Sequence, residues 1–112
     1  MVRTRGSATY GGVRMTTGTY TGDGAATQAI AGVGFTPRHV MIHVNLINAP
    51  GYKNDQDGVN AYIKWNGGSA FRYDADMIIS LDADGFTVGD GTPGLGNFYN
   101  VLNQVYTYIC FG

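Results

Sequence analysis

The sequence predicts an all-β fold, an antiparallel β-sandwich of jelly-roll-like form. Val, Ile, Thr, Tyr, Phe and Trp account for 41 of the 112 residues, whereas Glu is absent and Leu occurs four times. The first group suits a pleated, half-buried surface, and the strongest helix formers are scarce. Short runs of these residues alternate with clusters of Gly, Asn, Asp and Pro, which is the spacing of strands and turns. A helical bundle is therefore disfavoured.

The first three strands of this sandwich are expected between residues 16 and 47. Residues 16–21 are rich in Thr and Tyr and stop at a Gly-Asp-Gly turn, and residues 26–31 form a weaker strand that ends before Gly32. The clearest signal lies in residues 38–47, where one parity is occupied by Val40, Ile42, Val44 and Leu46. Alternation with a period of two describes a sheet with one buried face.

The middle of the chain contains a predicted loop and a predicted hairpin. Residues 48–58 are rich in Pro, Gly, Asn and Asp and are expected to form a surface loop, followed by a strand at residues 60–65. Residues 77–81 and 86–88 flank the sequence Asp-Ala-Asp-Gly. This predicts a β-hairpin, because Asp-Gly tolerates the positive φ that tight turns demand.

The last strand is expected at residues 104–111, after a Gly/Pro loop at 89–96 and a short strand at 98–101. One of its faces carries Val105, Thr107, Ile109 and Phe111, and the other carries Tyr106, Tyr108 and Cys110. Because both faces are largely apolar, the strand either lies centrally in the sandwich or has one face covered by another subunit. The second alternative predicts subunit packing through Tyr106, Tyr108 and Phe111.

The size and charge of the chain limit its function. A chain of 112 residues accommodates one domain with one core, and 44 % hydrophobic against 13 % charged residues argues against disorder. The net charge of −1 argues against a dedicated nucleic-acid binder. No apolar run approaches the roughly 18 residues of a membrane span, and the N-terminus lacks a hydrophobic signal core. We therefore expect a soluble protein without a secretion signal.

The N-terminal residues differ in charge from the rest of the chain. Residues 1–22 carry a net charge of +3 and residues 23–112 a net charge of −4. Residues 1–15 show no apolar period, so we expect an N-terminal arm in front of a single domain that spans residues 16–112. The arm is either a loose terminus with solvated charges or an extended segment that docks on a neighbouring acidic subunit through Arg3, Arg5 and Arg14.

The sequence motifs that suggest chemistry are better explained as turns. Residues 89–94 match the GxGxxG spelling, but no helical period follows them, so we interpret them as a loop. Asp-x-Asp-Gly occurs at residues 55–58 and 82–85, yet the remaining acidic positions of a calcium loop are missing. His39 and His43 lie on one strand face about 13 Å apart, which is too far for one metal ion.

Nucleophilic chemistry finds no support either. Cys110 lies beside two tyrosines in a predicted strand, where a buried and inert thiol is expected, and it has no second cysteine with which to form a disulfide. None of the three serines has a Gly-x-Ser-x-Gly setting. We therefore predict no catalytic residue, no cofactor and no metal, and a protein that is not an enzyme.

Four aromatic residues lie in or beside predicted loops and are candidate ligand contacts: Tyr52, Trp65, Tyr73 and Tyr99. Aromatic rings with Asn and Asp nearby stack on sugar rings or anchor a protein interface. The alternative is that these residues belong to the core or its rim.

Two stretches of the chain resemble a module of tailed-phage and prophage virion proteins. The first consists of residues 17–24 (TGTYTGDG) and 34–40 (GFTPRHV). The second consists of residues 84–88 (DGFTV), then Asn100, and residues 106–112 (YTYICFG). This spelling is similar to that of tail-fibre tips and small capsid-surface proteins. Asn103 stands where the module usually has a glycine, which keeps left-handed geometry feasible.

The resemblance implies a compact β-sandwich that assembles on the virion exterior without catalysis. A short arm and one sandwich suit a capsid decoration (cement) protein, which would stabilise the shell by binding it only when assembled. The implied partners are the major capsid protein and copies of this chain, a trimer being one arrangement, with no nucleic acid and no membrane. The alternative is a tip domain of a tail fibre or head fibre that binds a receptor or a host-surface glycan.

Overall fold

The computed structural model describes residues 5–10, 12–44, 51–58, 61–64, 71–74, 77–90 and 99–112. These residues contain no helix, and so none that is long and apolar enough to cross a membrane. The strands described are β1 (Arg5–Tyr10), β2 (Val13–Thr21), β3 (Thr27–Ile30), β4 (His39–Val44), β5 (Gly51–Asn54), β6 (Ala61–Lys64), β7 (Phe71–Asp74), β8 (Ile78–Asp82), β9 (Gly85–Gly89) and β10 (Val105–Phe111).

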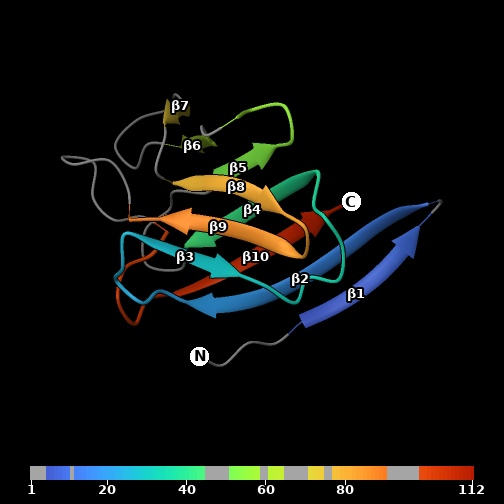
Figure 1. Cartoon of the computed structure of the whole chain (residues 1–112), viewed down its shortest axis with the longest axis horizontal. Helices are drawn as coiled ribbons and strands as arrows, with labels where there is room; N and C mark the ends of the chain where they lie inside the picture. Colours follow the sequence, from blue (N-terminus) through green and yellow to red (C-terminus); the bar gives the residue numbers. More distant parts are fainter. Residues whose placement is uncertain are drawn as a thin grey trace.

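These strands form two antiparallel sheets, so the predicted all-β sandwich is confirmed. The seven-stranded sheet has the order β1-β2-β10-β4-β5-β6-β7, and the three-stranded sheet has the order β3-β9-β8. The smaller sheet lies across one face of the larger one (Figure 1). β10 lies between β2 and β4, so the first of the two alternatives for this strand, a central position, is the one observed.

The core lies between the two sheets and follows the alternation of the strands. In β10, Tyr106, Tyr108 and Cys110 are fully buried, whereas Val105 and Thr107 are exposed. Val40 and Ile42 of β4 also face inward, as their parity predicts. The three-stranded sheet and its flanks contribute Ile30, Met77, Ile78, Phe86 and Val88.

Aromatic rings fill the centre of this core. The Tyr20 and Tyr106 rings stack with their centroids 4.9 Å apart, and Phe86 meets Tyr108 edge-on at 5.2 Å. Buried tyrosine hydroxyls need hydrogen-bond partners. Tyr20 Oη donates to the carbonyl of Tyr99 at 2.8 Å, and Tyr106 Oη accepts from the Val101 N–H at 3.0 Å. Burial raises the pKa of Tyr20, so its hydroxyl keeps its proton.

The segment after Tyr99 is not a strand, so the predicted strand at residues 98–101 is wrong in its described part. Its polar groups bond to the loop after β2 instead of to a sheet. The Asn100 carbonyl accepts from the Gly24 N–H, and Asn100 Nδ2 donates to Asp23 Oδ1 at 2.8 Å. Asn103 has a φ of 66°, the left-handed conformation that its side chain tolerates.

The predicted surface loop at residues 48–58 is also wrong in part, because it contains β5. This strand pairs with β4 from His39↔Asn54 to Ile42↔Gly51. Its inward residues are Gly51 and Lys53, which gave no hydrophobic signal in the sequence. The turn that follows agrees with the prediction, since Asp57 accepts from the Asn54 N–H and Gly58 has a φ of 63°.

The predicted arm is partly a strand of the sandwich. β1 pairs with β2 along its whole length, so the expected boundary between residues 15 and 16 lies inside β2. β7, at the opposite edge of the same sheet, had no counterpart among the predicted strands. The edge strands β1 and β7 are therefore held by backbone pairing with a neighbouring strand more than by their own hydrophobic pattern.

The predicted hairpin is present, but its glycine has a different role from the one expected. β8 and β9 pair with Asp82 opposite Gly85. Gly85 is not among the described residues with positive φ. A Cβ at Gly85 would lie 1.8 Å from the carbonyl oxygen of Ile30. Glycine is therefore required at this position because β3 approaches closely. The neighbouring Asp84 carboxylate accepts hydrogen bonds from the N–H groups of Gly32 and Gly34.

Candidate functional site

The side of the larger sheet that faces away from the core is the main candidate for an interaction surface. We call it the outer face and define it by the outward residues in the parts of β2, β10, β4 and β5 that pair with one another: Met15, Thr17, Thr19, Thr21, Val105, Thr107, Ile109, Phe111, His39, Met41, His43, Tyr52 and Asn54. The strand registers place these residues side by side, for example in the row Thr17, Ile109, Met41 and Tyr52. All of them are exposed or half-buried.

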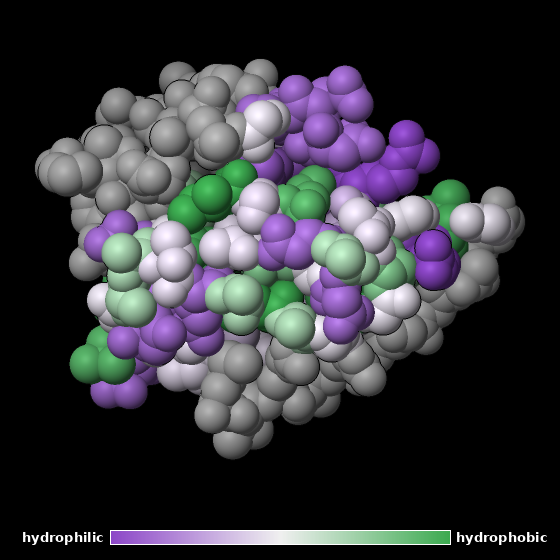
Figure 2. Space-filling model, viewed as in Figure 1, coloured by the Kyte–Doolittle hydropathy of each residue, from purple (hydrophilic) through white to green (hydrophobic). Residues whose placement is uncertain are grey.

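The outer face contains no Asp, Lys or Arg among its described residues. Two of its apolar residues are well exposed, Met41 at 40 % and Val105 at 42 %. The opposite surface of the molecule, over the three-stranded sheet, is different. There hydrophobic residues form small separate areas between hydrophilic ones (Figure 2), and Asp82 accepts hydrogen bonds from Ser80 and Thr87.

Aromatic contacts occur at one end of the outer face. The His39 ring lies 5.7 Å from the Tyr52 ring and 5.9 Å from the Phe111 ring, measured between centroids. His39 Nδ1 is also hydrogen-bonded to the side-chain oxygen of Asn54. These contacts link β10, β4 and β5 to one another on the outer face.

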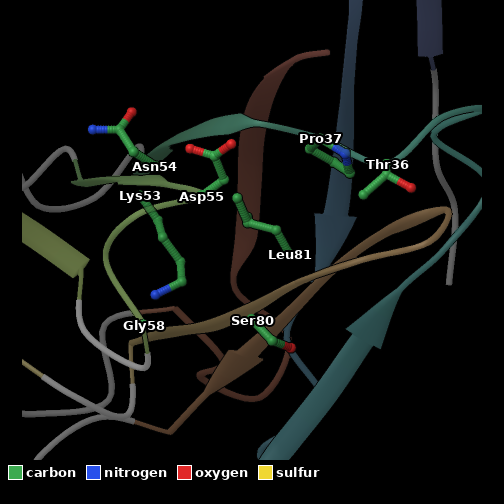
Figure 3. Close-up of a pocket in the computed structure, with 8 residues that line it drawn as sticks. All are labelled: Thr36, Pro37, Lys53, Asn54, Asp55, Gly58, Ser80 and Leu81. Carbon is green, nitrogen blue, oxygen red and sulfur yellow. The ribbon is translucent and has the colours of Figure 1, made fainter.

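A cavity of about 270 Å³ provides a second candidate site, between β5 and β8. It is lined by Thr36, Pro37, Lys53, Asn54, Asp55, Gly58, Ser80 and Leu81. Lys53 extends from β5 toward Ser80 and Gly58, whereas the side chains of Asn54 and Asp55 point the other way (Figure 3). Asp55 is paired with Arg38 at 3.3 Å.

Lys53 is the unusual residue of this cavity, because it occupies an inward position opposite the core residue Val40. It is only 2 % exposed. Burial lowers the pKa of its ammonium group, and the negative charge of Asp57 partly opposes this shift. The cavity is slightly smaller than the roughly 300–1,000 Å³ of drug-sized ligand sites. Its size suits ordered water or a single small polar group.

The structure corrects two of the three residues predicted for subunit packing. Tyr106 and Tyr108 are fully buried in the core, so they cannot contact another subunit. Phe111 lies on the outer face and is half-buried. The prediction placed the tyrosines on the wrong side, because the larger aromatic side chains fill the space under the three-stranded sheet.

The four candidate aromatic contacts have different positions. Tyr99 is fully buried, so the prediction that it contacts a ligand is wrong. Tyr52 lies on the outer face, and Trp65 lies outside the described residues. The backbone register brings Tyr73 into line with Tyr52, since Tyr52 pairs with Tyr62 and Tyr62 pairs with Tyr73.

The arginines predicted for docking are only partly described. Arg3 lies outside the described residues, and Arg5 begins β1. Arg14 is exposed on β2, where its guanidinium lies 5.1 Å from the centre of the Phe35 ring. This cation–π contact holds Arg14 against the sandwich.

The remaining candidates lie as follows. Cys110 is buried, and burial raises the pKa of its thiol to about 12, which agrees with the predicted inert thiol. His39 and His43 lie on the outer face. In the part of the chain that is described, no three His, Cys or Asp side chains are grouped as metal ligands. The GxGxxG segment lies mostly outside the described residues.

Sequence reasoning did not identify Lys53 or the extent of the outer face. Lys53 lies in a segment dominated by turn-forming residues, so its inward position gave no signal. The outer residues of β10 did give one, because Val105, Ile109 and Phe111 make a largely apolar face. Those of β4 did not, because Met41 lies between His39 and His43. Comparison with protein-family models, curated proteins and solved structures finds no match to this chain.

Proposed function

We propose that this chain is a non-enzymatic structural protein of a bacteriophage virion, a capsid decoration protein that binds the exterior of the head. The observation that supports this best is the outer face. Burying Asp, Lys or Arg at an interface costs free energy unless each finds a partner, and the described outer face has none of them. Exposed Met and aromatic side chains are typical of interface cores.

The mechanism is one of linked equilibria. A protein that binds only the assembled shell stabilises that shell, by an amount that grows with its concentration relative to the dissociation constant. The outer face would supply the contact area with the capsid. The basic N-terminal residues, with a net charge of +3 over residues 1–22, would favour an acidic neighbour.

A glycan-binding role at a fibre tip is the second candidate, and one observation favours it. Tyr52, Tyr62 and Tyr73 occupy opposed positions in the adjacent strands β5, β6 and β7. Opposed positions of an antiparallel sheet lie on one face. The three strands lie about 4.8 Å apart, a spacing that suits a sugar chain laid across them.

The experiment compares phage heads that carry the protein with heads that lack it. Met41→Asp places a charge on the outer face, and Ala29→Asp places the same charge on an exposed position of β3 as a matched control. We expect wild-type protein and Ala29→Asp to cosediment with heads and to raise the temperature of DNA release, and Met41→Asp to do neither. Equal binding of both variants to heads would overturn the proposal. So would finding the labelled protein at tail ends, together with glycan binding that Tyr52→Ala abolishes.

A further inference from the structure

The edges of the two sheets are not equally protected against pairing with another strand. The seven-stranded sheet ends at β1 and β7, and the three-stranded sheet ends at β3 and β8. An edge strand presents unpaired backbone N–H and C=O groups, which form a template for a further strand. Native proteins prevent this with short strands, charged residues, prolines or bulges at the edge.

Three of the four edges have such features. β7 and β3 contain four residues each, and β7 includes Arg72 and Asp74. β8 has an irregular register between Ile78 and Ser80, and it ends at Asp82. A bulge and a carboxylate both oppose the addition of a strand.

β1 has none of these features beyond its first residue. Its six residues pair with β2 in an unbroken register from Arg5↔Gly18 to Tyr10↔Val13. After Arg5 its sequence is Gly-Ser-Ala-Thr-Tyr, which contains no charge and no proline. β1 is therefore a regular strand with small residues, and it is the edge best suited to main-chain pairing.

We propose that β1 pairs antiparallel with β1 of a second copy of this chain, which joins two seven-stranded sheets edge to edge. Antiparallel pairing separates the two Arg5 residues to opposite ends of the contact, whereas parallel pairing would place them about 4.8 Å apart in adjacent strands. The two copies are then related by a twofold axis, the commonest symmetry of homo-oligomers. The inference does not depend on the proposed function, although it would make the two outer faces continuous.

The register of this contact is restricted to two choices. In an antiparallel pair, the N–H and C=O groups of two directly opposite residues either both point toward the partner strand or both point away from it. This direction alternates from one residue to the next along each strand. A symmetric pair must therefore place one residue opposite itself. The two central residues of β1 are Ser7 and Ala8. We place the axis at one of them, because an axis through a central residue pairs the largest number of residues.

Cysteine cross-linking in the full chain tests the contact. Under mild oxidation we expect either Ser7→Cys or Ala8→Cys, but not both to the same extent, to give a disulfide-linked dimer, with Thr27→Cys on the β3 edge as a monomeric control. The native Cys110 does not compete because it is buried. Failure of both β1 variants to cross-link, or equal cross-linking of the control, would overturn the proposal.

Sedimentation of the unmodified protein provides an independent measurement. We expect a mass that rises with concentration toward twice the 11.9 kDa of one chain. Ser7→Pro and Ala8→Pro remove N–H groups that point to opposite sides of β1, so only one of the two variants removes an N–H from the open edge. That variant should remain folded by circular dichroism and sediment as a monomer. A monomeric wild type at all concentrations, or a trimer, would contradict pairing between two β1 strands.

Discussion

The two faces of the seven-stranded sheet both carry hydrophobic residues but have different roles. The inner face carries Tyr20, Tyr106 and Tyr108, all fully buried beneath the three-stranded sheet. The outer face carries Met41 and Val105, which are exposed to solvent, and the half-buried rings of Tyr52 and Phe111. Hydrophobicity alone therefore does not identify the core side of a central strand. In β10 the core side is the one that carries Tyr106 and Tyr108, because their rings fill the space between the two sheets.

The largest expected effect is a test of the inner face by Tyr106→Ala. This substitution removes the stack with Tyr20 and the hydroxyl that accepts from the Val101 N–H, and it leaves a cavity. We expect a loss of about 3–5 kcal/mol in the free energy of unfolding, measured by chemical denaturation. Val105→Ala, the neighbouring residue on the outer face, is the control and should change stability by less than about 1 kcal/mol. Equal losses of stability in the two variants would contradict the different roles of the two faces.

A smaller effect is expected at Lys53, the charged residue on the inner side. Lys53→Met removes the cost of keeping an ammonium group away from water, so we expect a gain of roughly 1 kcal/mol at neutral pH. Burial lowers the pKa of Lys53 below its ordinary 10.5, so the unfolded chain binds the proton more tightly than the native one. The wild type should therefore gain stability as pH rises from the native pKa of Lys53 toward 10.5. The difference in the free energy of unfolding between Lys53→Met and the wild type should shrink over the same range.

Denaturation of both proteins between neutral and alkaline pH measures this difference. A variant that is less stable than the wild type at neutral pH would show that the fold depends on the charge of Lys53. In that case the inner side of β5 would belong to a polar site and not to the core.

The smallest effect is expected at the polar rim, where the inner face ends. The hydrogen bond from the Ala25 N–H, followed by that from Asn100 Nδ2, lowers the pKa of Asp23 from its ordinary 3.8. This contribution to stability is complete above the unfolded pKa and is lost as pH falls through the native pKa. We expect Asp23→Asn to flatten the loss of stability below about pH 4, measured by denaturation at a series of acidic pH values. Identical pH profiles for variant and wild type would contradict the role of this carboxylate.

Much of the fold could be predicted from the sequence, because strands such as β4 and β10 satisfy local pattern and tertiary contacts together. The β8–β9 hairpin was predicted for the same reason. The failures have physical causes: β1, β5 and β7 are held by backbone pairing with a neighbour, and Gly51 and Lys53 do not have the residue types that identify a strand. Residues 99–101 are held by the side chain of Asn100, which no periodicity reveals.

The candidate surfaces were harder to predict than the strands. The sequence indicated that β10 had two apolar faces, but the choice between them depended on where the three-stranded sheet lies. That sheet is formed by residues before β4 and after β7, so its position is a long-range property. Lys53 was missed because its cavity is assembled from three separate segments of the chain.

The position of β10 has a consequence for folding kinetics. This strand comes after all the other described strands in the chain, yet it separates β2 from β4 in the middle of the larger sheet. Until it is synthesised, the β1–β2 hairpin and the β4–β7 meander have no strand to join them. Contacts between residues so far apart in sequence slow folding, because the intervening chain must first be closed into a loop. Completion of this sandwich during translation therefore waits for the arrival of its central strand.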